Sequence, residues 1–104
     1  TGYGSRTQKE LRMKDYKKLS DPGEIVAQRR SELDMTQIEL AEKLDYPSVN
    51  FISMLEKKRS KVPLEKSVKF AKVLEIDEKW FIEKIMRDRY PIVAEVLFNP
   101  NSRK

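Results

Sequence analysis

The chain has 104 residues, of which 38% are hydrophobic, and it contains no cysteine and no histidine. A chain of this length forms one small domain with a modest core. The missing residue types exclude disulfides, thiolate nucleophiles, the usual zinc ligands and the commonest general base, so we expect no metal site, no cofactor and no enzymatic activity. The net charge of +5 suits a polyanionic partner. No apolar run approaches the roughly 20 residues that span a membrane, and no signal-like segment precedes the domain, which predicts a soluble cytoplasmic protein.

Residues 1–12 combine glycine, serine and threonine with scattered charge and predict a flexible N-terminal arm. Two origins stay open for it: Met13 is the natural start, or the arm is a true basic extension. We interpret its charge as a solvated surface rather than a phosphate-binding strip. The basic residues concerned are Arg6, Lys9, Arg12, Lys14, Lys17 and Lys18. Residues 1–20 are therefore expected to form a flexible or partly helical extension.

A first helix is expected to begin at Pro22, with Asp21 as its N-cap, and to end near Leu33. Its spacing leaves Arg29 and Arg30 nearer the surface. The residues that can face inward are Ile25 or Val26, together with Ala27 and Leu33.

The most informative stretch is 36–59, which predicts two short helices joined by a tight turn. Thr36 and Glu39 match the S/T-x-x-E capping box that fixes a helix start. The chain then stops the helix at Asp45-Tyr46-Pro47, because proline disfavours the helical conformation of the residue before it. The face expected to be buried recurs at i, i+3, i+4 and i+7 and consists of Gln37, Leu40, Ala41 and Leu44.

The next helix, expected over about 48–57, is more apolar than an ordinary surface helix, so some apolar side chains must face outward. Ile52 and Leu55 are expected to pack inward, whereas Phe51 and Met54 either fill the core as well or face out. Asparagine can pair with adenine, and apolar groups can touch the thymine methyl group in the major groove. The residues predicted to meet base edges are Ser48, Val49, Asn50, Ser53 and Met54.

A basic loop follows this helix, and it contains no acidic residue. Cations in such a position can grip phosphate and would contribute to binding of all DNA sequences alike. The residues are Lys57, Lys58, Arg59 and Lys61.

Two more helices are expected, one opening at Pro63 and ending near Leu74, and one capped by Asp77. The segment 91–98 is apolar and fits either a helix or a short strand. It either packs onto its own domain or crosses to a second subunit, and we favour the second subunit because dimeric helix-turn-helix proteins need an interface. The helix over 78–86 also leaves more apolar surface than a monomer needs, and such a surplus often marks a partner surface. The predicted dimerisation residues are Trp80, Phe81, Ile92, Val93, Val96 and Leu97. The last residues are expected to be frayed.

The segments TQIELAEKL and FISMLE, followed by the basic loop and Pro63, occur together and resemble the lambda-repressor-like, XRE-type helix-turn-helix family over about 25–86. The resemblance implies a compact, all-α, five-helix DNA-binding domain at 21–87, with 88–104 as a C-terminal dimerisation element and tail. It also implies that Gln37 contacts a phosphate and braces the recognition helix, and that Arg30 pairs with Glu56 near the DNA backbone. The expected phosphate-contacting residues are thus Arg30, Thr36, Gln37, Lys57, Lys58, Arg59 and Lys61.

Two departures from the family pattern affect this transfer. One extra residue lies between Ala41 and Ile52, and Asp45 stands where the family usually has a turn glycine. If the extra residue lies in the turn, Val49, Asn50 and Met54 read bases; without a gap, Phe51 and Met54 become core and Ser48, Val49 and Ser53 face the groove. We prefer the gapped register. Secondly, Lys57-Lys58 replaces a common Asn-Gly turn.

The hypothesis from the sequence is a sequence-specific transcriptional regulator of bacterial or phage origin, located with the nucleoid. It would bind a palindromic double-stranded DNA operator as a homodimer and act as a repressor, without a membrane partner. The alternative is an antitoxin or phage-type adaptor that binds a protein through the helix-turn-helix scaffold and the C-terminal apolar surface.

Overall fold

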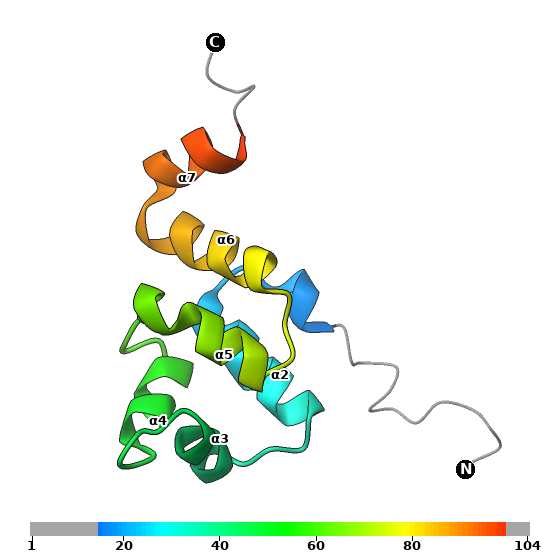
Figure 1. Ribbon diagram of the computed structural model, residues 1–104, viewed down its shortest axis with the longest axis vertical. Helices are drawn as coiled ribbons and strands as arrows, with labels where there is room; N and C mark the ends of the chain where they lie inside the picture. Colours follow the sequence, from blue (N-terminus) through cyan, green and yellow to red (C-terminus); the bar gives the residue numbers. More distant parts are fainter. Residues whose placement is uncertain (1–14, 100–104) are drawn as a thin grey trace, which may run out of the picture.

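The computed structural model describes residues 15–99, and this part of the chain is all-α, with no strand (Figure 1). The elements in chain order are the 3-10 turn η1 (Asp15–Lys18), α2 (Pro22–Glu32), α3 (Gln37–Lys43), α4 (Asn50–Glu56), the 3-10 turn η2 (Leu64–Lys66), α5 (Ser67–Val73), α6 (Glu78–Arg89) and α7 (Pro91–Phe98). The predicted all-α class is confirmed. The five helices expected for the domain correspond to α2–α6, and the segment 91–98, for which helix and strand were both open, adds a sixth α-helix. The predictions for residues 1–14 and for the tail beyond Asn99 lie outside the described residues.

Each of the helices α2 to α6 contributes one apolar face to a single core. Burial of a large apolar side chain contributes about 1.5–3 kcal/mol, so these faces supply the main driving force for folding. Both Ile25 and Val26 are buried, although the spacing had required only one of them. The other core residues of the helices are Leu40, Ala41, Ile52, Leu55, Phe70, Ala71, Phe81 and Ile85.

Three of the helices begin at a side-chain cap that the sequence predicted. The Asp21 carboxylate accepts a hydrogen bond from the Glu24 N–H at 3.0 Å, and the Asp77 carboxylate accepts one from the Trp80 N–H at 2.9 Å. Thr36 caps α3 in the same way. These bonds satisfy backbone donors that a helix N-terminus leaves without a partner, and they fix where each helix starts.

Four helices end in the same backbone motif, and none of them uses glycine. The residue after each C-cap has a positive φ of 55–64°, and the following N–H donates to a carbonyl five residues earlier, as in the Schellman motif. For an ordinary side chain this conformation costs about 1 kcal/mol relative to glycine. The four residues are Asp34, Asp45, Lys58 and Glu75.

The start of α2 lies against the end of α4 at a backbone-to-backbone contact. A Cβ atom built on Gly23 would lie 2.4 Å from the carbonyl oxygen of Leu55, which no real side chain tolerates. Gly23 is therefore required for the close approach of the two helices, and this contact fixes the C-terminal end of α4 against the body of the domain.

Arg29 is buried, with only 6% of its surface exposed, so the prediction that it lies near the surface is wrong. Its guanidinium donates to the carbonyl oxygens of Leu74 at 2.9 Å and Glu75 at 3.2 Å, and to the Glu32 carboxylate at 3.1 Å. Carbonyls at a helix C-terminus lack intrahelical partners. Arg29 supplies those partners at the end of α5, which explains how a charged side chain is accommodated inside the fold.

The turn η1 belongs to the predicted N-terminal extension, but its aromatic side chain joins the core. Tyr16 is buried and meets Trp80 of α6 edge-to-face, with ring centroids 5.4 Å apart. The Arg29 guanidinium lies 4.7 Å from the Tyr16 ring centroid. Burial raises the pKa of the Tyr16 hydroxyl. The ordered fold therefore starts before the cap at Asp21.

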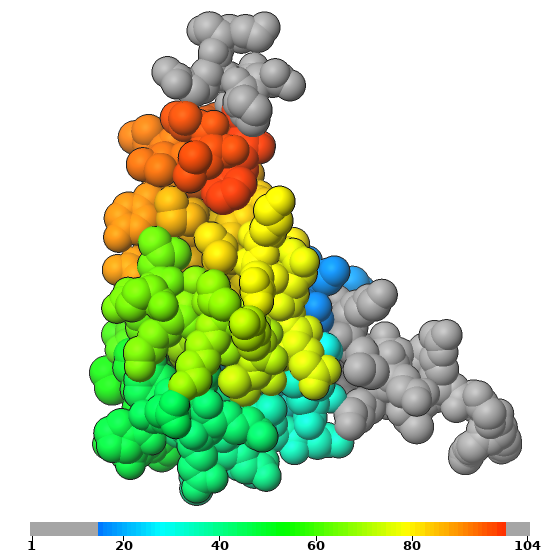
Figure 2. Space-filling model, in the orientation of Figure 1, coloured from blue at the N-terminus to red at the C-terminus, as the bar shows by residue number. Residues whose placement is uncertain are grey.

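The helices α3 and α4 lie together at one end of the molecule, and α7 lies at the other end, beyond α6 (Figure 1). In the space-filling view, α7 packs directly on α6 at the narrow upper end of the molecule (Figure 2). The two predicted functional surfaces, on α4 and on α7, are thus well separated.

Candidate nucleic-acid interface

The outward face of α4 is a single stripe at i, i+3, i+4 and i+7. Asn50, Met54 and Lys57 are exposed and Ser53 is half-buried, whereas Ile52 and Leu55 on the opposite face are fully buried. The helix begins at Asn50 rather than Ser48. Its exposed surface therefore offers an amide, a hydroxyl and a thioether in one row, followed by a cation.

The exposure of Met54 fits the gapped register, whereas Val49, to which that register gives a base-reading position, is half-buried in the turn before α4. Ile52 and Leu55 face the core, Met54 is 43% exposed, and Glu56 reaches Arg30. Phe51 takes an intermediate position, half-buried against the core. The ungapped register, in which Met54 would be core, does not fit this structure.

Ser48 and Val49, the other two residues predicted to meet bases, lie in the turn. The Ser48 Oγ accepts a hydrogen bond from the Asn50 N–H at 3.2 Å, so this hydroxyl stabilises the first turn of α4. Val49 is half-buried at the N-cap position and makes no side-chain cap. Ser48 and Val49 thus flank the stripe but do not belong to it.

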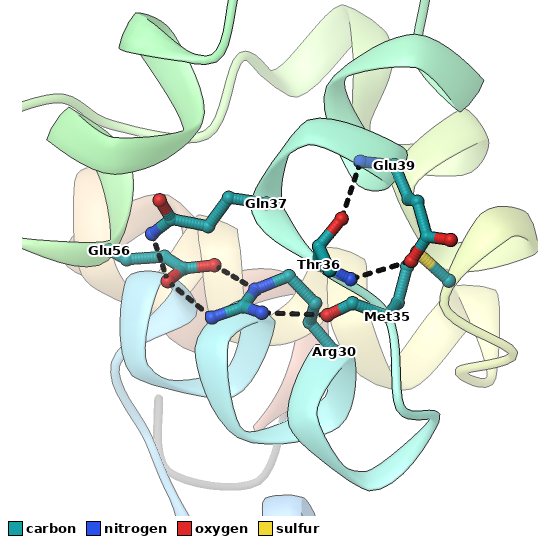
Figure 3. A network of polar contacts seen from close by, with 6 residues as sticks. All are labelled: Arg30, Met35, Thr36, Gln37, Glu39 and Glu56. Carbon is teal, nitrogen blue, oxygen red and sulfur yellow. Dashed lines mark hydrogen bonds and ion pairs between the residues drawn. The ribbon is translucent and has the colours of Figure 1, made fainter.

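The C-terminal end of α4 is held by a polar network that joins three helices (Figure 3). Arg30 of α2 grips both carboxylate oxygens of Glu56, at 2.7 and 3.0 Å, and donates to the Met35 carbonyl oxygen at 2.7 Å. The Gln37 amide donates to the same carboxylate at 2.9 Å. The Arg30 and Glu56 side chains are largely buried, with 19% and 9% of their surfaces exposed, so water screens this ion pair only weakly. The predicted pairing of Arg30 with Glu56 and the bracing by Gln37 are present.

The start of α3 is fixed by the predicted capping box (Figure 3). The Thr36 hydroxyl accepts from the Glu39 N–H at 3.0 Å, and the Glu39 carboxylate accepts from the Thr36 N–H at 2.8 Å. Gln37 is the first residue of the helix and sits between this box and Glu56. The N-terminus of α3 and the C-terminus of α4 are consequently one rigid unit.

The four cations of the basic loop fall into two classes. Lys58 pairs with Glu24 of α2 at 2.6 Å, and Lys61 pairs with Asp88 of α6 at 2.9 Å. The hydrogen bond to Glu24 raises the pKa of the Lys58 ammonium. Lys57 and Arg59 are exposed and have no ionic partner within residues 15–99. Lys57 and Arg59 are thus free to bind a phosphate, whereas Lys58 and Lys61 would first have to leave their carboxylate partners.

Lys58 also shapes the loop. It takes the left-handed conformation, with φ of 64°, and its N–H donates to the Leu55 carbonyl oxygen, while the Arg59 N–H donates to that of Met54 at 2.8 Å. Lys57-Lys58 therefore follows the path that an Asn-Gly pair would favour, at the backbone cost of a non-glycine residue.

The predicted dimerisation residues divide between surface and core. Four of them form the outer face of α7: Ile92, Val93, Val96 and Leu97 are 79%, 48%, 45% and 59% exposed. Ala94 is the buried residue of α7. An open apolar groove of about 440 Å³, lined by Trp80, Ile82 and Phe98, runs between α6 and α7.

Phe81 is fully buried inside the protomer, so its prediction as a dimerisation residue is wrong. It lies with Ile85 on the i, i+4 face of α6 that packs into the core, and no part of it is left for a second chain. Trp80 is half-buried, and its ring is already in contact with Tyr16.

Several residues that shape this end of the molecule were not anticipated. Glu24 and Asp88 neutralise loop cations, and Lys69 of α5 forms an ion pair with Asp45 in the turn before α4. The partners in these pairs are 24 or more positions apart in the sequence. No local periodicity signals such a contact, so only the fold could reveal it.

Two other classes of site were sought in the described residues. Between positions 15 and 99, acidic side chains do not gather in a group of three that could hold a metal ion. None of the helices in that range has the length and apolar character needed to cross a membrane.

Comparison with protein families gives one match, to a helix-turn-helix family, which covers residues 26–81 and thus more than half of the chain. The matched region contains α3, α4 and the polar network that joins them. No curated protein and no solved structure matches the chain.

Proposed function

This chain belongs to the lambda-repressor-like, XRE-type family of DNA-binding helix-turn-helix proteins, and we propose that it is a sequence-specific transcriptional regulator that reads double-stranded DNA with α4. The observation that carries the proposal is the exposed stripe of Asn50, Ser53 and Met54 on a helix held at both its apolar face and its C-terminal end. The major groove admits one α-helix, and these groups match the hydrogen-bonding and methyl features of base edges. In this proposal the protein is encoded by a bacterium or a phage and acts on nucleoid DNA in the bacterial cytoplasm.

Asn50 is the residue we assign to direct base recognition, as a bidentate partner of adenine. It is exposed at the first turn of α4, which is the part of a recognition helix that meets base edges. Met54, one turn later, supplies an apolar contact for a thymine methyl group. Ser53 lies between them on the same stripe.

Phosphate contacts come from the N-terminal end of α3 and from the basic loop. Gln37 uses one amide hydrogen on Glu56 and keeps its amide oxygen and second hydrogen for other partners. Thr36 stands beside it at the helix start. Arg30 directs three of its donors inward, so its role in this proposal is to hold Glu56 and, through it, Gln37.

The basic loop supplies the remaining phosphate contacts, mainly through the two cations that form no ion pair within residues 15–99. Lys57 and Arg59 would bind without breaking an existing pair, whereas Lys58 and Lys61 would exchange Glu24 and Asp88 for phosphate. Exposed ion pairs of this kind contribute little net stability, so the exchange costs little.

A homodimer on a palindromic operator is the assembly that fits this proposal. Two half-sites about one helical turn apart would then be engaged together. The exposed apolar face of α7 supports self-association, because a monomer rarely leaves four large apolar side chains on one helix to water. Repression is the outcome we favour, since a bound dimer blocks polymerase without further parts.

The test is selection of bound sites from a random pool of DNA duplexes. The proposal expects one enriched palindrome, with binding that weakens steeply as salt rises. Asn50→Ala should relax preference at one base pair by about 1–3 kcal/mol. Asn99→Ala, which removes the same side chain at the opposite end of the molecule, is the matched control. An unchanged site preference in Asn50→Ala would overturn the assignment of the α4 face.

The loop is tested by comparing two cations that differ in their partners. Arg59→Ala should lower the affinity for every DNA sequence alike. It should also reduce the slope of log affinity against log salt concentration by about one unit. Lys61→Ala should have a smaller effect, because Asp88 already neutralises Lys61 in the free protein. Equal losses in both variants would contradict this division of the loop.

The α7 face also supports a second candidate function, a protein-binding adaptor or antitoxin. The apolar groove beside Trp80 and Phe98 is the observation in its favour. Absence of DNA binding, together with stable co-purification of a second protein, would favour the adaptor. Salt-sensitive binding of random duplex DNA, with tighter binding of one palindrome, would favour the regulator.

A further inference from the structure

The turn between α3 and α4 is tied to η2 and α5 by three contacts, one from η2 and two from α5. The Asp45 carboxylate forms an ion pair with Lys69. The Lys66 ammonium lies 4.5 Å from the centroid of the Tyr46 ring. That ring lies 6.4 Å from the ring of Phe70, which is fully buried in α5. The turn is therefore held from one side by η2 and α5.

Tyr46 also reaches forward to α4. The centroids of the Tyr46 and Phe51 rings are 4.9 Å apart, and Phe51 is in the first turn of the helix, next to Asn50. Aromatic rings at this separation attract each other beyond their shared burial. One ring thus connects the core of α5 to the start of the helix that carries the base-reading stripe.

The contacts of the Tyr46 ring, and not those of its hydroxyl, hold this side chain in place. The oxygen is buried and has no hydrogen-bond partner among the described residues. A buried polar atom without a partner is unfavourable, so the hydroxyl opposes the placement that the ring contacts stabilise. Burial also raises the pKa of Tyr46.

The start of α4 has one local support, the Ser48 hydroxyl, which accepts a hydrogen bond from the Asn50 N–H. The helix has seven residues, Val49 provides no side-chain cap, and no acidic residue lies in the first turn. A helix this short is not stable alone and depends on tertiary contacts. Its C-terminal end is fixed by Arg30, Glu56 and Gln37, but none of these reaches the first turn.

We propose that Tyr46 is a positioning residue for DNA reading: its ring, held on Phe70 and under Lys66, fixes Phe51 and so the orientation of Asn50 on the first turn of α4. This inference rests on the proposed function, in which α4 reads bases. Base contacts depend on the orientation of the helix, whereas phosphate contacts from the flexible loop cations tolerate small shifts. Loss of the ring therefore reduces discrimination between operator and random DNA more than it reduces binding to random DNA.

The experiment measures the ratio of operator to random-duplex affinity for three variants, at a temperature where circular dichroism shows each to be folded. Tyr46→Leu removes the aromatic contacts and should lower the ratio about tenfold or more. Tyr46→Phe keeps the ring and should stay within about twofold of the parent ratio. Ile85→Ala, a core truncation on α6, controls for lost stability and should also leave the ratio unchanged. A preserved ratio in Tyr46→Leu, or an equal loss in Tyr46→Phe, would overturn the proposal.

A second measurement needs no DNA and so separates this inference from the proposed function. In Tyr46→Leu, backbone amides of α4 should exchange with solvent about tenfold faster relative to those of α2, whereas Tyr46→Phe and Ile85→Ala should keep the parent ratio. Equal acceleration of α4 and α2 in Tyr46→Leu would show that Tyr46 supports the whole fold and would refute the positioning role. If the parent binds no DNA sequence selectively, the proposed function fails while this exchange result still decides whether Tyr46 orients α4.

Discussion

The two ends of the molecule differ in whether their side chains find partners within the protein. At the α3–α4 end, a polar network is satisfied within the protein: Arg30 and Gln37 both donate to Glu56, and Thr36 and Glu39 cap α3. At the α7 end, the helix buries Ala94 and exposes a row of large apolar side chains. Figure 1 places these ends on opposite sides of the α5–α6 body.

The difference indicates what each end requires from a partner. A rigid polar surface with a few outward groups can bind a polar ligand without rearranging, because its internal bonds are already made. An apolar row exposed to water gains free energy when any matching apolar surface covers it. We call the α3–α4 end complete, because its network is satisfied within the protomer, and the α7 end incomplete, because its apolar row is exposed to water.

The largest expected effect is at the complete end. Glu56→Ala would leave the partly buried Arg30 and Gln37 without their shared acceptor and should lower the free energy of unfolding by about 2–3 kcal/mol, less than for a fully buried pair. Urea denaturation followed by circular dichroism measures it. Glu42→Ala, an exposed glutamate on α3, is the control and should change stability by less than about 0.5 kcal/mol. Similar small losses in both variants would mean that the network does not hold this end together.

The next effect concerns the incomplete end. Replacing both Val96 and Leu97 by serine should weaken self-association about tenfold or more, because two exposed apolar side chains leave the predicted interface. Sedimentation velocity over a range of concentrations measures the change. The stability of the protomer should stay within about 0.5 kcal/mol, as neither side chain is in its core.

Ile38→Ser is the matched control for the α7 variant. Ile38 is 60% exposed, but it lies on α3, at the other end. This substitution should leave self-association unchanged. If Ile38→Ser dissociates the protein and the α7 variant does not, the interface lies on α3 and not on α7, which would contradict our interpretation.

Backbone strain can be compared between the body of the domain and the turn before α4. Glu75→Gly, in the body of the domain, relieves a φ of 55° and should raise stability by about 1 kcal/mol. Asp45→Gly relieves the same conformation in the turn before α4 but removes the pair with Lys69, so it should stabilise less. Thermal denaturation of both variants compares them. A larger gain from Asp45→Gly would show that the ion pair contributes nothing.

The smallest effect is a pH dependence from the same turn. The hydrogen bond from Lys69 holds the pKa of Asp45 below its ordinary value. A lowered pKa in the folded state adds stability above the unfolded pKa of about 4, and this contribution is lost as pH falls through the folded value. Asp45→Asn should therefore show a slightly flatter loss of stability as the pH falls below about 4 in urea titrations. Identical acid profiles would indicate that the pair does not form in solution.

Much of the fold was predictable because its signals are local. The caps at Asp21, Thr36 and Asp77 and the inward face of Ile52 and Leu55 follow from short-range spacing. The pairing of Arg30 with Glu56 came from family resemblance rather than from spacing. The gapped register was chosen because it keeps Ile52, Leu55 and Glu56 together, and it stays a prediction.

Other features could not be predicted because their causes are not local. Arg29 is buried because carbonyls at the end of α5 need donors, and Phe81 is buried because α6 turns that face toward the core. Four helix ends carry no glycine, so the usual stop signal was missing. The carboxylates opposite Lys58 and Lys61 come from α2 and α6 and are invisible in the basic loop itself.

The sequence by itself determined where most helices start, which side chains supply the core and which row of α4 is polar, since periodicity and caps act within a few residues. The tertiary structure alone decided which charges are free, which are buried and which apolar residues remain outside. Those outcomes depend on groups brought together from distant positions, where the loss of water around a charge or an apolar surface is set by the neighbours and not by the residue.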